Sequence, residues 1–214
     1  MKIALIGASG FLGTYILKEA LRRGHWVTAI VRHPDKISIQ DPALSAKKGD
    51  VLNENEVAAL TEGHDAVISA YNPGWNEPDI YNIQIKGYKS IINGVKRARV
   101  KRLLAIGGAG SLEVSPGKQL VDSPDFPEQW KGGSLAMRDV LNMLKDEKEL
   151  NWTFLSPAIT IQPGERTGKF RLGTDQPVMN DKGESTISAG DLAAAILDEI
   201  ESPQYIRQRF TLGY

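Results

Sequence analysis

Residues 1–13 read MKIALIGASGFLG, a short apolar run that meets three glycines, Gly7, Gly10 and Gly13. A strand that turns sharply into a helix needs a residue without Cβ at the bend, and Gly7 supplies it. Gly10 would let the backbone approach a pyrophosphate closely, and Gly13 would let the helix pack tightly on its strand. The helix N-terminus offers free N–H groups and the positive end of its dipole. The stretch therefore predicts a loop that cradles the phosphates of a nucleotide.

The context of these glycines adds to their weight. Their spacing, GxxGxxG, is one residue longer in its first gap than the dinucleotide fingerprint GxGxxG, and a glycine triplet alone is weak evidence. Here it lies between a predicted strand over residues 2–6 and a predicted helix over residues 14–23, as the motif requires. A glycine-rich turn without a ligand is the alternative. In the first interpretation the cofactor loop also includes Ser9, Phe11 and Leu12, with the Ser9 hydroxyl bonding a phosphate or capping the helix.

Apolar runs of strand length alternate with amphipathic segments of helix length, which is typical of βαβ units and a parallel sheet buried on both faces. We predict one α/β domain over residues 1–214, a doubly wound Rossmann fold whose parallel sheet is flanked by helices. Residues 157–188 and 201–214 would form a small appended C-terminal region for the substrate. The predicted strands cover residues 2–6, 26–31, 45–49, 66–70, 102–106, 152–156 and 209–212. The predicted helices cover residues 14–23, 79–99, 133–149 and 192–200, and a further helix follows residue 53.

Local signals mark several helix ends. Gly24 is expected to close the first helix as its C′ residue. Asn53 and Glu56 have the spacing of a capping box. Ser188 and Asp191 have the spacing of an S-x-x-D cap, which predicts a helix start directly after them.

Composition excludes several classes of protein. Lys plus Arg equals Asp plus Glu at 26 each, so no nucleic-acid or membrane partner is expected. The absence of cysteine rules out disulfides, cysteine nucleophiles and thiolate zinc sites. The three histidines, His25, His33 and His64, have no metal-ligand spacing, and no metal is expected. The chain shows no signal peptide or membrane span, so we expect a cytoplasmic protein.

Two irregular stretches, residues 71–78 and 107–132, follow the predicted fourth and fifth strands. Both lie at carboxyl ends of strands, where ligands bind in an open parallel sheet. The second is much longer than an ordinary connection, and loops of that length are usually functional or mobile. Trp75 and Trp130 in these stretches would stack on a flat substrate or pack the loops onto the body of the protein.

The second predicted strand ends in Arg32, about 20 residues past the glycine loop, where an acidic residue usually binds the ribose hydroxyls of NAD. A carboxylate would repel a 2′-phosphate, whereas a guanidinium pairs with it and stacks on adenine. Arg32 therefore favours NADP(H), with NAD(H) as the less favoured cofactor. A solvated arginine at a strand end is the alternative. His33 would line the adenine pocket or lie exposed in the loop.

Small and polar residues follow the third and fourth predicted strands. Asp50 and Val51 stand where this kind of fold contacts adenine, with the carboxylate accepting from the exocyclic amine. An Asp50 that merely caps a turn is an equal alternative. Ser69, Ala70 and Tyr71 suit backbone approach to the ribose and nicotinamide, although Tyr71 would serve equally in loop packing.

Gly107, Gly108 and Ala109 end the fifth predicted strand with almost no side chain, which leaves space above a nicotinamide for a flat partner. Alcohol and ketone reductases of this fold carry YxxxK at the start of the next helix, where the phenol gives the proton. Residues 130–137 read WKGGSLAM and contain no such motif. Ser111 is only a weak catalytic candidate, because it lies a few residues later than a catalytic serine would.

The chain resembles the atypical short-chain dehydrogenase/reductase superfamily in GASGFLG, VRHP, GDVLN, DAVISAYNP, VKRLLAIGGAGSLEV and WTFLSPA, which occur in this order. More closely it is similar to an NAD(P)-binding group known as NADH-flavin reductases, whose relatives include biliverdin reductase B and NmrA-like redox sensors. PGERTGKFRLGTDQ and IRQRFTLGY also resemble that group, so the similarity covers essentially the full length.

The resemblance implies a cofactor groove lined by the glycine loop and by the turn that holds Pro157 and Ala158. The groove would also be lined by the residues at the strand ends, which are Arg32, Asp50, Val51, residues 69–71 and residues 107–109. The missing Tyr and Lys speak against alcohol oxidation, epimerisation and dehydration. Flavin reduction stays compatible, because hydride transfer to N5 needs close stacking and its proton can come from solvent.

Three functions follow as hypotheses. The first is an NADPH-dependent reductase of a flat acceptor, a flavin or a quinone. The second is a non-catalytic sensor that binds NADP(H) and changes its affinity for a protein partner with the redox state. A sugar-nucleotide epimerase or dehydratase ranks last, because the short region after Ser156 leaves little material for a sugar-nucleotide domain. The sequence leaves monomer and homodimer equally open.

Overall fold

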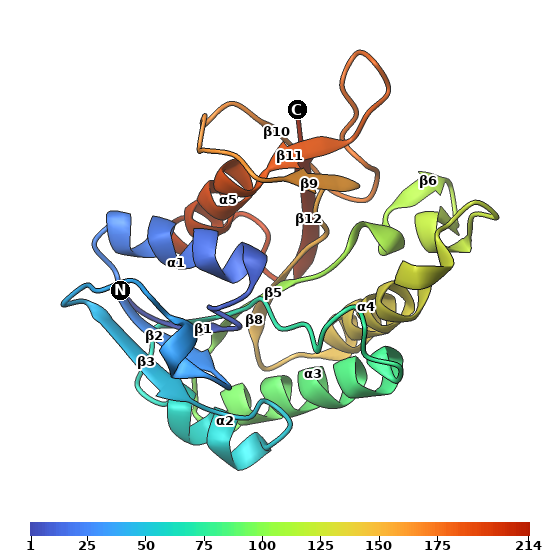
Figure 1. Ribbon diagram of the computed structural model, residues 1–214. Helices are drawn as coiled ribbons and strands as arrows, with labels where there is room; N and C mark the ends of the chain where they lie inside the picture. Colours follow the sequence, from blue (N-terminus) through green and yellow to red (C-terminus); the bar gives the residue numbers. More distant parts are fainter.

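The computed structural model describes residues 1–214 and shows an eight-stranded sheet between two layers of helices (Figure 1). From one edge to the other, the strands are β10 (Arg171–Gly173), β12 (Gln208–Gly213), β8 (Asn151–Leu155), β5 (Arg102–Ile106), β4 (Ala66–Ser69), β1 (Lys2–Ile6), β2 (Trp26–Val31) and β3 (Leu44–Lys48). All neighbours pair in parallel except β10 and β12. The chain leaves β1 first toward β3 and then toward β12, which is the doubly wound Rossmann order that the sequence predicts.

The helices α1 (Phe11–Arg22) and α5 (Ala189–Glu201) cover one face of the sheet, and α2 (Glu54–Thr61), α3 (Ile80–Arg97) and α4 (Glu128–Asp146) cover the other (Figure 1). Each face has its own core. Ile3 and Leu5 of β1 belong to the first, and Ala4 and Ile6 belong to the second. Because successive strand side chains point to opposite faces, burial on both sides explains the continuous apolar run of β1. None of the helices is long and apolar enough to cross a membrane.

Three helices begin earlier than the sequence predicts. α1 begins at Phe11 instead of residue 14, because Gly10 already has the extended N-cap conformation. α5 begins at Ala189 instead of residue 192, directly after its cap Ser188. α4 begins at Glu128 instead of residue 133, after an N-cap at Pro127. Other predicted element ends differ from the structure by one to three residues, as is usual at frayed ends.

The early start of α4 has a packing cause. Two successive glycines, Gly132 and Gly133, are poor helix formers and predict that the helix does not extend through them. Both nevertheless lie inside α4. A Cβ at Gly133 would meet Trp75 Cζ3 at 2.8 Å and Ile80 Cδ1 at 3.0 Å. The glycines therefore allow the loop before α3 to pack closely against α4, and this tertiary contact outweighs their poor helix propensity.

The predicted capping residues are confirmed. Gly24 follows α1 with a φ of +79°. The Asn53 side chain accepts from the N–H groups of Asn55 at 3.1 Å and Glu56 at 3.4 Å, and the Ser188 hydroxyl accepts from the Asp191 N–H at 3.0 Å. The Glu56 carboxylate reaches the N–H of Asp50, at 2.9 Å, so this box closes one turn further back than the usual pattern.

Short strands that the sequence does not predict organise the irregular segments. β6 (Glu113–Ser115) and β7 (Lys118–Gln119) form a hairpin within residues 107–132. β9 (Thr160–Gln162) and β11 (Thr186–Ser188) pair in parallel between β8 and α5. In the proposed appended region, β12 and β10 extend the main sheet at one edge, beyond β8. Strands of two or three residues carry too little periodicity for sequence analysis to detect.

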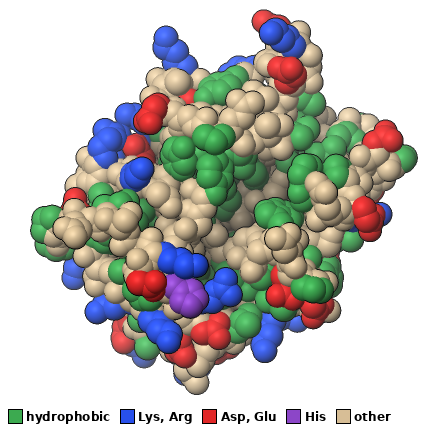
Figure 2. All heavy atoms as spheres, in the orientation of Figure 1, with side chains coloured by type: hydrophobic (Ala, Val, Ile, Leu, Met, Phe, Trp, Pro, Cys, Tyr) green, Lys and Arg blue, Asp and Glu red, His purple; other side chains and the backbone are tan.

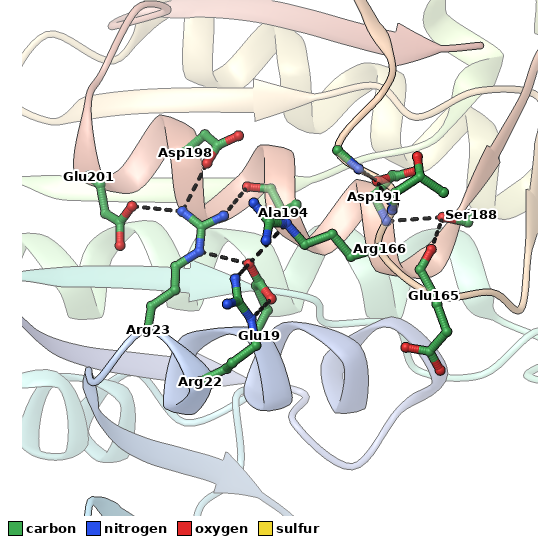
Figure 3. Close-up of polar contacts among 12 residues, drawn as sticks. Glu19, Arg22, Arg23, Glu165, Arg166, Ser188, Asp191, Ala194, Asp198 and Glu201 are labelled. Carbon is green, nitrogen blue, oxygen red and sulfur yellow. Dashed lines mark hydrogen bonds and ion pairs between the residues drawn. The ribbon is translucent and has the colours of Figure 1, made fainter.

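A network of ion pairs ties α1 to α5 (Figure 3). Arg23 lies between the two helices and pairs with Glu19 at 2.7 Å, Asp198 at 2.8 Å and Glu201 at 2.6 Å. Glu19 also accepts from Arg22 at 2.8 Å. The hydrogen bond from Arg22, with further bonds and charge from Arg23, lowers the pKa of the Glu19 carboxyl to about 2.

The shifted pKa of Glu19 predicts an acid-dependent loss of stability. Its folded pKa of about 2 lies below the ordinary value of 4.5, so its stabilisation is complete above pH 4.5 and disappears as the pH falls toward 2. Glu19→Gln should melt at a lower temperature than wild type at pH 7, and the difference should shrink on acidification. Thermal melts between pH 7 and pH 2 measure this. Glu54→Gln, which removes an exposed pair with Arg97, is the control with a small expected effect. A constant gap between wild type and Glu19→Gln would contradict the prediction.

Candidate functional site

Two of the three loop glycines are required by packing within the protein. Gly7 has a φ of +80°, and a Cβ there would lie 2.7 Å from the backbone oxygen of Ala70. A Cβ at Gly13 would lie 2.0 Å from the backbone oxygen of Gly7. The loop after β1 is therefore pressed between α1 and the end of β4, which fixes where the N-terminus of α1 lies.

Gly10 differs from both, because a side chain there would meet only one backbone atom of the protein. Its φ of −77° and ψ of 172° suit any residue, and a Cβ would meet only the Gly7 oxygen, at 3.3 Å. Directly after it, the N–H groups of Phe11, Leu12 and Gly13 have no acceptor within the protein. No side chain caps α1, so the Ser9 hydroxyl does not take the capping role. The turn thus presents unpaired donors at an accessible helix N-terminus, which is an arrangement that binds phosphate.

At the carboxyl end of β2, Arg32 and His33 are both exposed, and neither makes an ion pair within the chain. Across the edge of the sheet, the Asp50 carboxylate accepts from the Leu52 N–H at 2.9 Å, so Asp50 does cap a turn. Asp50 is nevertheless exposed, with Val51 half-buried beside it. A free guanidinium is thus available at this edge for an anionic ligand.

Tyr71, which follows β4 at the candidate site, also packs against α3. Its ring fills the space at Gly87 of α3, where a Cβ would lie 2.3 Å from Tyr71 Cε1. The Gln84 side chain donates to the Tyr71 backbone oxygen at 3.2 Å. Burial raises the pKa of the Tyr71 phenol to about 12, with opposing effects from Arg32 and Asp50 nearby. The phenol therefore stays protonated at neutral pH.

Ser69 and Ala70 precede this tyrosine. Ser69 is fully buried, and its hydroxyl donates to the Tyr88 hydroxyl at 3.4 Å and accepts from the Tyr71 N–H at the same distance. Ala70 is half-buried, and its N–H donates to the Ile6 oxygen at 3.0 Å. Both residues continue the ladder between β1 and β4 and set the direction of the loop that follows.

The two glycines at the end of β5, Gly107 and Gly108, have different surroundings. The space at Gly107 is taken by Phe154 of β8, since a Cβ there would lie 2.1 Å from the phenyl ring. At Gly108 a Cβ would meet no other atom within 4 Å. Open space thus begins at Gly108 and Ala109, one residue later than the sequence suggests.

Ser111 is buried, with 1% of its surface exposed, and its hydroxyl lies 3.3 Å from the Ser156 hydroxyl. The Ser111 hydroxyl therefore contacts another part of the protein and is not accessible to a ligand.

After Ser156, Pro157 and Ala158 are buried at the same edge of the sheet. Trp75 is 53% exposed and Trp130 is 46% exposed, and Trp75 also packs against Gly133.

The predicted site residues gather at the carboxyl ends of six neighbouring strands, β3, β2, β1, β4, β5 and β8. The face in Figure 2 is hollowed near its centre between groups of hydrophobic side chains, with a histidine among Lys and Arg side chains below. Sequence analysis misses Gly87 and Gln84, which hold Tyr71 in place. Their roles depend on contacts between α3 and a loop, for which no local pattern exists.

The chain is similar to known proteins over nearly its whole length. The model of a family described as NAD(P)H-binding matches residues 7–203. The uncharacterized protein YwnB of Bacillus subtilis (strain 168) is 40% identical over 215 residues, which cover 99% of this chain and 98% of YwnB.

Solved structures extend the similarity over the whole chain. A provisionally named epimerase of Bacteroides thetaiotaomicron is 50% identical, with a TM-score of 0.94 over 100% of this chain and 96% of its own. A provisionally named NADH-flavin reductase of Streptococcus pneumoniae TIGR4 is 37% identical, with a TM-score of 0.85 over 100% and 99% of the two chains. The fold is therefore the Rossmann-like α/β fold that these relatives share.

Proposed function

The chain belongs to the NAD(P)H-binding family, and on that premise we propose that it is an NADPH-dependent reductase that transfers hydride to a flat acceptor, a flavin or a quinone. The observation that carries the proposal is the open space at Gly108, directly beyond the end of β5. This space adjoins the ends of β4 and β8, the neighbours of β5, and we place the nicotinamide ring there. The name of the Streptococcus pneumoniae relative supports the same class of acceptor.

The residues present fit a dinucleotide cofactor. The three unpaired N–H groups that follow Gly10 would hold the pyrophosphate, since nothing in the protein competes for them. Arg32 would pair with a 2′-phosphate and so favour NADPH over NADH. We place the adenine near His33, Asp50 and Val51, and the ribose and nicotinamide near residues 69–71, 107–109 and 157–158.

The bound cofactor would supply the hydride, and the contribution of the protein is position and the exclusion of water. Backbone at Gly108 and Ala109 lets a planar ring lie close, because no side chain stands in the way. Trp75, in the loop before α3, packs against Gly133 of α4. The acceptor proton comes from solvent in this scheme, because the Ser111 hydroxyl is buried and Tyr71 has a high pKa.

Turnover with NADPH tests the proposal, and Gly108→Val sharpens the test. Wild type should oxidise NADPH when FMN, FAD or a quinone is added, seen as loss of the nicotinamide absorbance band. Gly108→Val should lower kcat/KM for the acceptor by about tenfold or more by filling its space. Tight NADPH binding with no turnover across a broad acceptor panel would refute the reductase.

A redox sensor and an epimerase are the two alternative functions, and each predicts a different result. A redox sensor predicts different affinities for NADP⁺ and NADPH and a protein partner, without turnover. An epimerase, as the Bacteroides relative is named, needs an acid–base pair beside the nicotinamide. The first turns of α4, residues 130–137, contain no YxxxK motif, so we rank the epimerase last. A cytoplasmic location, where reduced nicotinamide cofactors are abundant, suits the proposed reductase.

A further inference from the structure

A buried arginine joins three segments of the chain beside the proposed acceptor site. The side chain of Arg209, on β12, is only 6% exposed. Its Nη1 donates to the backbone oxygen of Ser111 at 2.6 Å, and its Nη2 pairs with the Asp175 carboxylate. The backbone oxygen of Asp175 accepts in turn from the N–H of Glu113 at 2.8 Å. We call this closed set of contacts the Arg209 ring.

The Arg209 ring holds a segment whose centre, at Ser111 and Leu112, is buried. Residues 109–113 follow Gly108 directly and lie outside the main sheet. Within the segment, the Leu112 N–H donates to the Ala109 oxygen at 2.9 Å, and the Leu112 oxygen accepts from Leu120 at 2.8 Å. The ring adds two anchors on either side of Leu112, at Ser111 and at Glu113. The wall of the open space at Gly108 is therefore set by a side chain almost one hundred residues further along the chain.

The energetics of burial favour a positioning role for Arg209. Removing a guanidinium from water costs free energy, and a well-packed apolar residue often stabilises a protein as much as a buried ion pair. An apolar side chain would suit this place, because the register partner of Arg209 on β8 is Phe154. The Nε of Arg209 is buried without a partner, which adds to the cost. Arginine can donate hydrogen bonds to the segment after β5, and a hydrophobic residue cannot.

We propose that Arg209 is a positioning residue for the acceptor site. Through Ser111 and Asp175 it fixes residues 109–113 and thereby sets the shape of the space in which the acceptor lies. Arg209 does not touch the acceptor, since both Nη atoms are engaged within the protein. The effect on the acceptor rests on the proposed reductase function, whereas the fixing of the segment does not.

Arg209→Lys tests the proposal, with Arg102→Lys as a matched control. Arg102 of β5 is also buried, pairs with Glu199 at 2.9 Å and has an unpartnered Nε, but it faces α5 on the opposite side of the sheet. Both variants should lower the melting temperature. Only Arg209→Lys should raise the acceptor KM, by about tenfold, the scale of one lost charge-assisted hydrogen bond. The affinity for NADPH and kcat should stay close to wild type.

Hydrogen exchange gives a readout that needs no acceptor. The amides of residues 109–113 should exchange about tenfold faster in Arg209→Lys and in Asp175→Asn, and at the wild-type rate in Arg102→Lys. Unchanged exchange in Arg209→Lys would overturn the inference, as would an equal rise of KM in both arginine variants. A wild-type protein that reduces no acceptor would refute the proposed function alone, and the exchange rates would still decide whether Arg209 positions the segment.

Discussion

Gly10→Val is expected to abolish NADPH binding while the fold persists. The variant places a branched side chain where the pyrophosphate would lie against the N-terminus of α1. Losing two or more hydrogen bonds to phosphate, at about 1.5–3 kcal/mol each, predicts an affinity loss greater than about a hundredfold. The fold should tolerate the change, because the φ and ψ of Gly10 suit valine and only the Gly7 oxygen lies near the added Cβ, at 3.3 Å. Fluorescence titration with NADPH measures the affinity, and a thermal melt measures the stability.

Gly13→Ala is the matched control for this variant. Its Cβ would lie 2.0 Å from the backbone oxygen of Gly7, so a smaller substitution three residues away should damage the fold itself. We expect a large drop in melting temperature for Gly13→Ala and a drop of a few degrees at most for Gly10→Val, from a poorer N-cap. Wild-type affinity in Gly10→Val would mean that the pyrophosphate does not lie at this turn.

Arg32→Glu is expected to reverse the preference between the two nicotinamide cofactors. A carboxylate repels the 2′-phosphate and accepts from ribose hydroxyls, so NADPH should bind about ten- to a hundredfold more weakly while NADH changes little or improves. Arg32 is exposed and makes no ion pair within the chain, so the substitution breaks no internal contact. Dissociation constants for both cofactors, measured at one salt concentration, test the prediction.

Lys36→Glu provides the matched change of charge four residues further along. Lys36 is exposed on the short helical turn after β2, so it alters the field near the site without the fork geometry of arginine. If Lys36→Glu weakens NADPH as much as Arg32→Glu does, general electrostatics account for the preference. Equal weakening of NADPH and NADH by Arg32→Glu would assign Arg32 to stacking or folding.

The fold class could be predicted from the sequence because its signals are local. The apolar strands, the glycine turn after β1 and the caps at Asn53 and Ser188 depend on residues within a few positions of one another. The start of α4 could not be predicted from the sequence, because Gly132 and Gly133 lie in the helix where Trp75 and Ile80 pack against them. Local propensity predicts a break there, and a tertiary contact prevents it.

The candidate site divides in the same way. The sequence by itself determined the Rossmann order, the turn with its three glycines after β1 and the strand ends at which the predicted site residues gather, because spacing along the chain encodes them. Only the tertiary structure decided which glycine offers space. The spaces at Gly7, Gly13 and Gly107 are filled by Ala70, the loop backbone and Phe154, whereas a Cβ at Gly10 would meet only the Gly7 oxygen and one at Gly108 would meet nothing within 4 Å.

The link from Arg209 to Ser111 and Asp175 likewise exists only in the folded chain. Contacts between residues far apart in sequence leave no periodicity or motif, because they depend on how sheet, helices and loops pack together.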